Sequence, residues 1–187
     1  EETELVIPSE IDGKAVIAIS NSAFAKNTAI TSVTIPSSVK TIGKSAFAGC
    51  TGLTEVEIPS SVTVLGSYAF EDCAKLEKVT LNEGLVTIGN RAFGSTKISS
   101  VYIPTTLKNV EMESMNYTGP FYNCASLNDI EFGAGITAIS DYLFYYCNGI
   151  TEIEIPDTVT TIGKRAFGSC PSLKNVEISS SVKTIGI

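Results

Sequence analysis

The sequence contains no histidine among its 187 residues. This absence excludes Ser-His-Asp triads, zinc sites with histidine ligands and acid–base catalysis by imidazole. The chain also lacks any run near the roughly 18–20 consecutive apolar residues of a membrane-spanning helix. It shows no positively charged start followed by an apolar run, so no secretory signal is visible. We therefore expect no histidine-dependent enzyme and no membrane insertion within this segment.

Basic residues are also scarce relative to acidic ones. Lysine and arginine number 13 against 20 aspartates and glutamates, which gives a net charge of −7. An acidic protein is repelled by the phosphates of nucleic acid, so we expect no nucleic-acid partner. With 43% hydrophobic and 18% charged residues, the chain is predicted to fold.

Phenylalanine recurs at a nearly constant interval along the chain. Successive repeat phenylalanines are 23 residues apart, except for one gap of 28; they are Phe24, Phe47, Phe70, Phe93, Phe121, Phe144 and Phe167. The residues between them keep the same register, and one unit reads C-x-x-L-x-x-V-x-I-P-x-x-V-x-x-I-G-x-x-A-F. A period of this length indicates a solenoid, in which each unit buries its apolar side against the next.

One unit combines a short strand with a return segment. In the stretch LTEVEIP, Val56 and Ile58 alternate with Glu55 and Glu57, which is typical of a half-buried strand. Pro59 has no N–H to donate, so we expect strand pairing to stop there. In the return segment, most units have a glycine directly after the apolar residue of the I-G pair in the repeat motif. We expect a turn with positive φ at this glycine. These glycines are Gly43, Gly66, Gly89, Gly163 and Gly186.

The repeat motif resembles the BspA-like leucine-rich-repeat family, whose 23-residue repeats occur in bacterial, often cell-surface, proteins. The opening LVIPSEIDGKAVIAISNSAF is similar to the first unit of such arrays, with DGKAV as an insertion. The resemblance implies a mainly β, leucine-rich-repeat solenoid of about seven to eight coils. Short parallel strands would line a concave face, and short strands or turns would form the convex side. It also implies an extracellular or cell-surface location and adhesion to host or neighbouring-cell proteins.

We expect residues 1–187 to form a single solenoid domain. The register places the next repeat phenylalanine at position 190, beyond the last residue of the sequence. A coil interrupted there leaves an apolar edge uncovered. We therefore expect the chain to be a fragment of a longer protein, or its last coil to be capped by another molecule.

Five cysteines each stand three residues after a repeat phenylalanine: Cys50, Cys73, Cys124, Cys147 and Cys170. Asn27 and Thr96 fill the same position in other coils, which favours a small side chain turned into the core. Equivalent Cβ vectors of stacked coils run parallel about 4.7–4.9 Å apart. A disulfide needs Cβ atoms about 3.8 Å apart and turned toward each other. Because no C-x-x-C pair exists either, we expect buried free thiols with no metal and no nucleophilic role.

The outward positions of the predicted strands are rich in acidic residues, whereas basic residues gather on the return side. Two interpretations fit this pattern. The faces are simply solvated and keep the array soluble, or the acidic face binds a cation, a basic protein or a glycan. Paired carboxylates also occur in glycosidases, but here they recur with the repeat and imply no pocket. The candidate partner-binding acids are Glu55, Glu57, Asp129, Glu131, Glu152, Glu154 and Glu177.

The one break in the period follows Val110, where EMESMNYTGPF replaces the usual GKSAF and adds six residues. Inserts in solenoids form loops on one face and often carry recognition. By repeat register, Tyr142 lies beside Arg165 and Tyr68 beside Arg91, and neighbours of this kind can form cation–π contacts. Alternatively, these side chains cap an irregular coil by packing on one another. The candidate partner-binding residues of this patch are Met112, Met115, Tyr117, Tyr122, Tyr142, Tyr145, Tyr146 and Arg165.

We interpret the chain as a non-catalytic protein-binding or adhesion module with no cofactor and no metal site. Two alternatives stay open. The first is a glycan-binding surface protein that uses the tyrosine patch, and the second is an architectural spacer that presents another domain. No residue set supports an enzyme.

Overall fold

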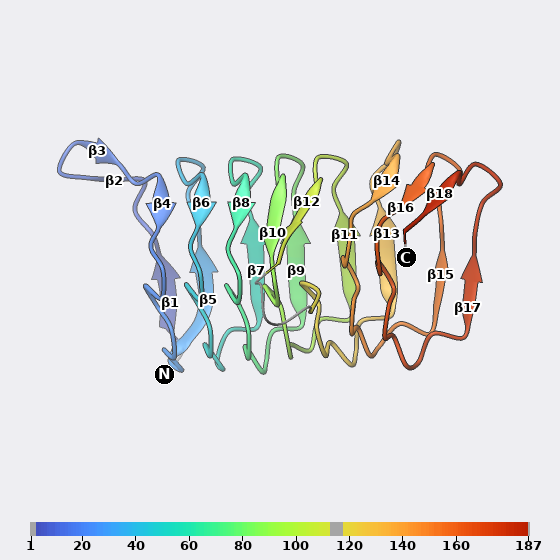
Figure 1. Cartoon of the computed structure of the whole chain (residues 1–187). Helices are drawn as coiled ribbons and strands as arrows, with labels where there is room; N and C mark the ends of the chain where they lie inside the picture. Colours follow the sequence, from blue (N-terminus) through green and yellow to red (C-terminus); the bar gives the residue numbers. More distant parts are fainter. Residues whose placement is uncertain (1–2, 113–117, 187) are drawn as a thin grey trace.

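The computed structural model describes residues 3–112 and 118–186 and shows a solenoid of about eight turns. Within these residues the regular elements are short β-strands, without a helix. Figure 1 shows the coils stacked one after another from the N-terminal to the C-terminal end. The predicted stack of 23-residue coils is confirmed.

The first strands of the coils form one row, with neighbouring strands paired in parallel two by two. The pairs are β1 (Thr3–Val6) with β5 (Ile30–Thr34), β7 (Glu55–Ile58) with β9 (Lys78–Leu81), β11 (Ser100–Ile103) with β13 (Asp129–Phe132), and β15 (Glu152–Glu154) with β17 (Asn175–Glu177). Strand β7 ends directly before Pro59, as the missing N–H of proline predicts.

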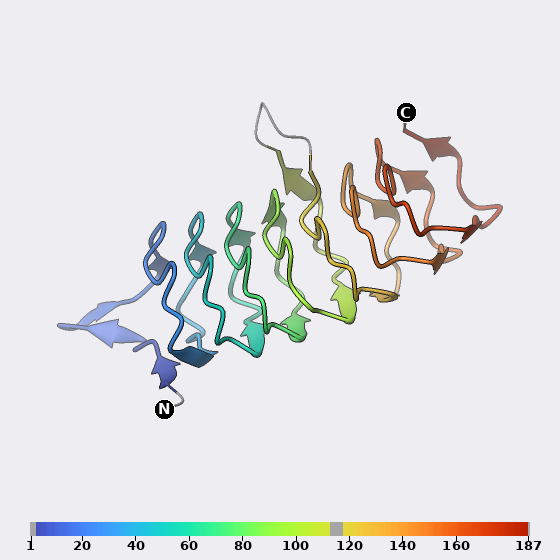
Figure 2. The same ribbon diagram turned by 90° about the horizontal axis from the view of Figure 1, so that it is seen from below.

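The return strands form a second row, on the other side of the coil (Figure 2). A five-stranded sheet contains β4 (Ala18–Ile19), β6 (Thr41–Ile42), β8 (Val64–Leu65), β10 (Thr87–Gly89) and β12 (Asn109–Glu111). A three-stranded sheet contains β14 (Ala138–Ile139), β16 (Thr161–Ile162) and β18 (Thr184–Ile185). Near the N-terminus, β2 (Glu10–Ile11) and β3 (Lys14–Ala15) form an antiparallel hairpin.

The interior contains a column of the repeat phenylalanines. Neighbouring rings from Phe24 to Phe167 are stacked, with centroids between 5.1 and 5.8 Å apart. The rings between these two ends are completely buried. Burying one such side chain contributes about 1.5–3 kcal/mol, so the column is a major source of stability.

The repeat glycines serve close packing between coils. A Cβ on Gly66 would lie 2.7 Å from the carbonyl carbon of Gly43, and one on Gly89 would lie 2.1 Å from the backbone nitrogen of Ser67. None of the five repeat glycines has a positive φ. The prediction of left-handed turns at these glycines is wrong, because it is the backbone of the preceding coil that excludes a side chain there.

Left-handed backbone instead flanks the repeat phenylalanines. Ser45 has φ of 54° and Gly49 has φ of 72°, on either side of Phe47, and most other coils repeat this pattern with residues other than glycine. Positive φ is costly for such residues, so the surrounding structure must hold it. The Phe47 N–H donates to Ala69 O at 2.8 Å, and the Gly49 N–H donates to Glu71 O at 2.7 Å, both in the next coil.

Candidate interaction surfaces

The acidic residues of the first strands point to solvent. Strand side chains alternate between two faces, and in β7 the buried Val56 and Ile58 alternate with the exposed Glu55 and Glu57. The same alternation exposes the acids of β13, β15 and β17. One face, named the acidic face below, therefore carries Glu55, Glu57, Asp129, Glu131, Glu152, Glu154 and Glu177.

In the N-terminal half, the acids of this face have partners within the protein. Glu55 lies 3.8 Å from the ammonium of Lys78, and both side chains are well exposed. The Asn82 amide donates a hydrogen bond of 3.0 Å to Glu57. Exposed ion pairs of this kind contribute little to stability, but they do offset the local negative charge.

Both halves of the acidic face have a groove, but the one beside Glu55 and Glu57 also contains Lys78, whereas the one in the C-terminal half has no basic side chain. Strands β13 and β15 belong to separate sheets, and the space beside them forms a groove of about 340 Å³. Glu154 and Glu177 are register partners on β15 and β17, so two like charges lie side by side. No described residue forms an ion pair with the acids of the groove, and the lining contains no basic side chain. These acids are Asp129, Glu152, Glu154 and Glu177.

Most of the tyrosine patch packs on itself. Tyr142 and Tyr145 are only 9% and 8% exposed, and their rings meet edge to face with centroids 5.5 Å apart. The centroid of the Tyr146 ring lies 4.7 Å from that of Tyr145 and 5.9 Å from that of Tyr122. Among the described tyrosines of the patch, Tyr146 is the exposed one, at 42%. A partner can therefore reach Tyr146 directly, whereas Tyr142 and Tyr145 belong to the interior.

The remaining members of that patch are placed as follows. Met112 is half-buried at the end of the coil that contains β12, and Arg165 is exposed. Met115 and Tyr117 lie outside the described residues.

Two arginines make cation–π contacts with tyrosines that repeat register does not suggest. The guanidinium of Arg91 lies over the Tyr122 ring at 4.2 Å, and that of Arg165 lies over the Tyr145 ring at 5.9 Å. Arg91 Nε is also 2.8 Å from a carboxylate oxygen of Glu71, although its N–H is not aimed at that oxygen. In both contacts the tyrosine directly follows a repeat phenylalanine, in the next coil for Arg91 and in the preceding coil for Arg165.

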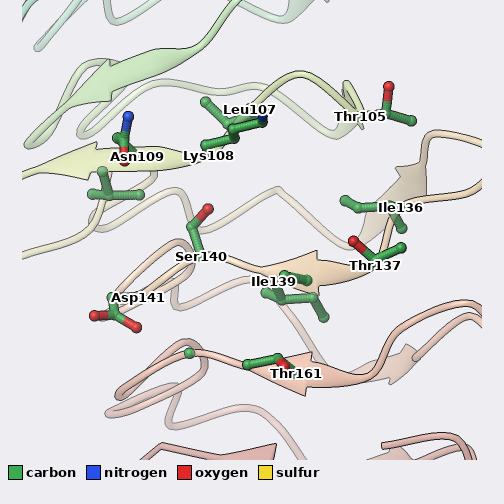
Figure 3. A pocket seen from close by; sticks show the side chains of 13 residues that line it. Thr105, Leu107, Lys108, Asn109, Ile136, Thr137, Ile139, Ser140, Asp141 and Thr161 are labelled. Atoms are coloured by element: carbon green, nitrogen blue, oxygen red, sulfur yellow. The ribbon is translucent and has the colours of Figure 1, made fainter.

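A second groove lies on the return side, where β12 and β14 are not paired. It measures about 420 Å³. Figure 3 shows Leu107, Lys108 and Asn109 on one side of it, and Ile139, Ser140 and Asp141 on the other. Sequence reasoning did not identify this groove, although the six-residue insert after Val110 marks the coil where the row is interrupted.

Four cysteines are buried in the core, as predicted, whereas Cys170 is only half-buried. Burial raises the pKa of all five thiols, which disfavours nucleophilic chemistry. All five are free thiols, as predicted. The Cys73 thiol donates to the backbone carbonyl of Phe47 at 3.2 Å, and burial raises its pKa to about 12. Burial likewise raises the pKa of Cys124 to about 11. Within residues 3–112 and 118–186, no cluster of three or more acidic or thiol side chains is arranged to hold a metal ion.

A comparison with known protein families identifies one match. The model of the BspA type leucine-rich-repeat region matches in six copies, over residues 3–119 and 117–187. No curated protein matches the chain. In the part of the chain that the structure describes, we find no helix of the length and apolar character needed to cross a membrane.

Several solved structures are similar to this one. A leucine-rich-repeat protein of Treponema pallidum is 28% identical with a TM-score of 0.74, over 92% of this chain and 78% of that one. A leucine-rich-repeat protein of Bacteroides ovatus is 24% identical with a TM-score of 0.63, over 98% of this chain and 56% of that one. A leucine-rich cell surface protein of Faecalibacterium prausnitzii is 22% identical with a TM-score of 0.52, over 97% of this chain and 70% of that one. This chain therefore spans little more than half the length of the Bacteroides protein.

Proposed function

Because the chain belongs to the BspA-type leucine-rich-repeat family, we propose that it is a non-catalytic protein-binding module of a bacterial surface or secreted protein. Solenoids of this kind present extended surfaces on which partners can bind. One similar structure, from Faecalibacterium prausnitzii, is that of a cell surface protein, which supports an extracellular or cell-surface location. Adhesion to host or neighbouring-cell proteins is the role that we propose there.

We propose that the partner binds the C-terminal half of the acidic face through a basic surface of its own. One observation carries this proposal: exposed carboxylates line a groove without any basic side chain, and Glu154 lies beside Glu177 in register. Like charges in this arrangement disfavour the free protein. A partner that brings lysines or arginines would relieve the repulsion and would also be steered toward the groove.

The experiment measures binding of the chain to purified extracellular-matrix and cell-surface proteins by biolayer interferometry, together with a glycan array. We expect one or more basic proteins to bind, with an affinity that falls as salt concentration rises. If the chain bound none of the proteins and none of the glycans, the result would contradict a binding module and favour the architectural spacer.

Two matched variants locate the site. The change Asp129→Asn, Glu152→Gln, Glu154→Gln removes three charges from the groove while preserving side-chain shape. We expect it to weaken binding about tenfold or more, since loss of about 1.4 kcal/mol is tenfold. The control Asp72→Asn, Glu77→Gln, Glu111→Gln removes three exposed charges elsewhere and should leave binding nearly unchanged. Equal effects of both variants would show that only net charge matters.

A second candidate function, glycan binding, is favoured by the exposure of Tyr146 next to Tyr122. An exposed tyrosine offers an apolar ring face together with a hydroxyl, which suits the mixed surface of a sugar. If the ligand is a glycan, Tyr146→Ala should abolish binding on the array while the three-charge groove variant still binds.

A further inference from the structure

The row of return strands has a gap in the middle of the solenoid. Among the strands that the structure describes, β12 is paired only with β10, and β14 only with β16. These two strands lie farther apart than other neighbours of the row (Figure 1 and Figure 2). The same coils stay joined elsewhere, since β11 pairs with β13 and the Phe93 ring stacks on that of Phe121. The core therefore holds the two edges of the gap in place.

Elsewhere in the row, each return strand donates hydrogen bonds to the strand before it. The Thr63 N–H donates to Lys40 O at 2.9 Å, and the Gly66 N–H donates to Ile42 O at 2.8 Å. Equivalent bonds recur in the coil that contains β16. Parallel strands exchange such bonds at even spacing, so each return strand offers N–H groups to the preceding coil and carbonyls to the following one.

Across the gap these bonds are missing. Thr137 and Ser140 are the equivalent donors of the coil that contains β14, and their N–H groups have no acceptor among residues 3–112 and 118–186. The equivalent acceptors, Lys108 O and Val110 O, receive no backbone N–H from that part of the chain. One side of the gap therefore offers donors and the other offers acceptors, as the neighbours of a strand inside a parallel sheet do.

The gap contains the groove of about 420 Å³ on the return side. Its apolar lining comes from Leu107, Val110, Ile136 and Ile139. Val110 and Ile139 stand at the same position of the repeat, so an apolar side chain fits between them. An uncovered strand edge pairs readily with a strand of another chain, and here one such strand can pair on both of its sides.

The sequence departs from the repeat on both sides of the gap. After the first coil, the glycine of the I-G pair is replaced only by Glu111 and Ser140. A Cβ on Gly163 would lie 2.4 Å from the backbone nitrogen of Asp141, in the turn of the preceding coil. The Ser140 side chain would meet such a turn at the regular distance. Glu111 pairs with Gly89 of β10, however, so a strand that continues straight admits a side chain there.

Single charges mark the two ends of the groove. Lys108 directly precedes β12, Asp141 follows β14, and both are exposed. Figure 3 shows them on opposite sides of the groove. No described residue forms an ion pair with Lys108. These charges favour a strand that runs parallel to β12 and β14, with an acid near its beginning and a base near its end.

We propose that an extended segment of a partner protein inserts between β12 and β14 as a parallel strand and completes the return row. Its carbonyls accept from β14 and its N–H groups donate to β12, in the manner of strand addition. One apolar side chain fits between Val110 and Ile139, an acid lies beside Lys108 and a base lies beside Asp141. This site is on the opposite side of the coil from the acidic face, so it is separate from the site proposed above.

The probe is a synthetic peptide that copies one of the chain's own return strands. Residues 157–164 contain β16 and end in Lys164, which repeat register places beside Asp141. In the peptide, Thr160→Glu adds the acid beside Lys108. We expect isothermal titration calorimetry to show one-to-one binding to the 187-residue chain, whereas a scrambled peptide of the same composition should not bind. Absence of binding by the probe would overturn the proposal.

Hydrogen exchange, followed by nuclear magnetic resonance, locates the bound peptide. The N–H groups of Thr137 and Ser140 should exchange rapidly in the free chain and about tenfold or more slowly in the complex, since they then donate to the peptide. Thr63, in the regular part of the row, should be unaffected. Unchanged exchange at Thr137 and Ser140 would place the peptide elsewhere. Protection of Thr137 in the free chain would show that the chain's own residues fill the groove. Either result overturns the proposal.

Two variants at one position test the backbone contact. The Val64 N–H donates to Lys40 O at 3.4 Å, so the equivalent N–H of Ala138 faces the gap. Ala138→Pro removes this donor at an open strand edge, where proline is tolerated, and Ala138→Val keeps it with a similar bulk. We expect the proline variant to bind the probe about tenfold more weakly than the valine variant. Equal affinities would contradict strand addition.

A charge exchange tests the direction of the strand without altering the backbone. Lys108→Glu should weaken binding of the probe about tenfold. A second peptide, with Thr160→Lys in place of Thr160→Glu, should bind this variant more tightly than it binds the original chain. If the exchange does not restore binding, the peptide does not lie as a parallel strand in the proposed register.

Discussion

At the residue scale, the cysteine position shows what the repeat requires at its core. Cys50 donates its S–H to the Phe24 carbonyl at 3.2 Å, as Cys73 does to the carbonyl of Phe47. Thr96 fills the same position, and its hydroxyl donates to Phe93 O at 2.8 Å. The position therefore holds a small donor that reaches a phenylalanine carbonyl, that of the preceding coil for Cys50 and Cys73 and that of the same coil for Thr96.

We predict that the buried thiols do not react in the folded protein. Burial raises the pKa of Cys73 and Cys147 to about 12, so thiolate is scarce at mildly alkaline pH. A thiol reagent such as dithionitrobenzoate should label Cys170 first, because that side chain is partly exposed. Labelling of all five cysteines should require unfolding by denaturant. Rapid labelling of Cys73 in the native state would contradict this prediction.

At the scale of the element, the turn after β9 shows how a local departure from the repeat is stabilised. Here Asn82 replaces the usual proline, and the Glu83 carboxylate reaches into the next coil. It accepts hydrogen bonds from the Tyr102 hydroxyl at 2.8 Å, the Thr105 N–H and hydroxyl at 2.9 Å each, and the Thr106 N–H at 3.2 Å. Burial by itself raises the pKa of Glu83, but these hydrogen bonds outweigh it and lower the pKa below 4.5.

The change Glu83→Gln should lower the free energy of unfolding by about 1 kcal/mol at neutral pH, since charge-assisted bonds become neutral ones. A lowered carboxyl pKa stabilises the folded state above the unfolded value of 4.5, and this stabilisation is lost as the pH falls through the folded pKa. The difference between the two proteins should therefore vanish in acid. Urea unfolding at a series of pH values measures it, with Glu77→Gln as the exposed control. A difference that persists unchanged at low pH would contradict the ionic origin.

Two glycines at the same register position offer a matched pair of substitutions. Gly84 and Gly135 both have positive φ, of 118° and 86°. A Cβ on Gly84 would lie 2.0 Å from Ser60 O, whereas a Cβ on Gly135 would meet nothing within 4 Å. Gly135→Ala should cost about 1 kcal/mol from backbone strain alone, and Gly84→Ala should cost at least about 2 kcal/mol because the clash adds to it. Equal losses in thermal unfolding would show that coil contact at Gly84 is unimportant.

At the scale of the whole molecule, the insert interrupts the return row but not the phenylalanine column in the interior. The return row divides between β12 and β14. The phenylalanine column passes the same point without a gap, with Phe93 and Phe121 stacked at 5.8 Å. The interruption therefore opens a surface groove while the core stays continuous.

Hydrogen exchange should detect this interruption. The Thr63 N–H donates to Lys40 O at 2.9 Å, and the Thr160 N–H donates to Thr137 O at 2.9 Å. The Thr137 N–H, at the equivalent position beside the break, has no acceptor among the described residues. By nuclear magnetic resonance, Thr137 should exchange much faster than Thr63 and Thr160, since it needs no opening to meet water. Equal protection at the three sites would show that the return row is continuous in solution.

The sequence by itself determined the 23-residue coil, the parallel strand rows, the phenylalanine column and the free thiols. These features follow from where apolar and small side chains recur, because a unit with one apolar side can be buried only by its neighbours. The exposure of the acidic face was predictable for the same reason, since strand residues alternate strictly between two faces.

Only the tertiary structure decided the features that depend on the path of the neighbouring backbone. In the folded chain Tyr142 and Tyr145 are buried, whereas Tyr146 is exposed. Positive φ occurs at residues that flank the repeat phenylalanines and not at the repeat glycines. The tertiary structure also established that the turns donate their hydrogen bonds in one direction. A pattern of side chains specifies which residues are buried, but backbone direction and the space between coils arise only when the coils pack together.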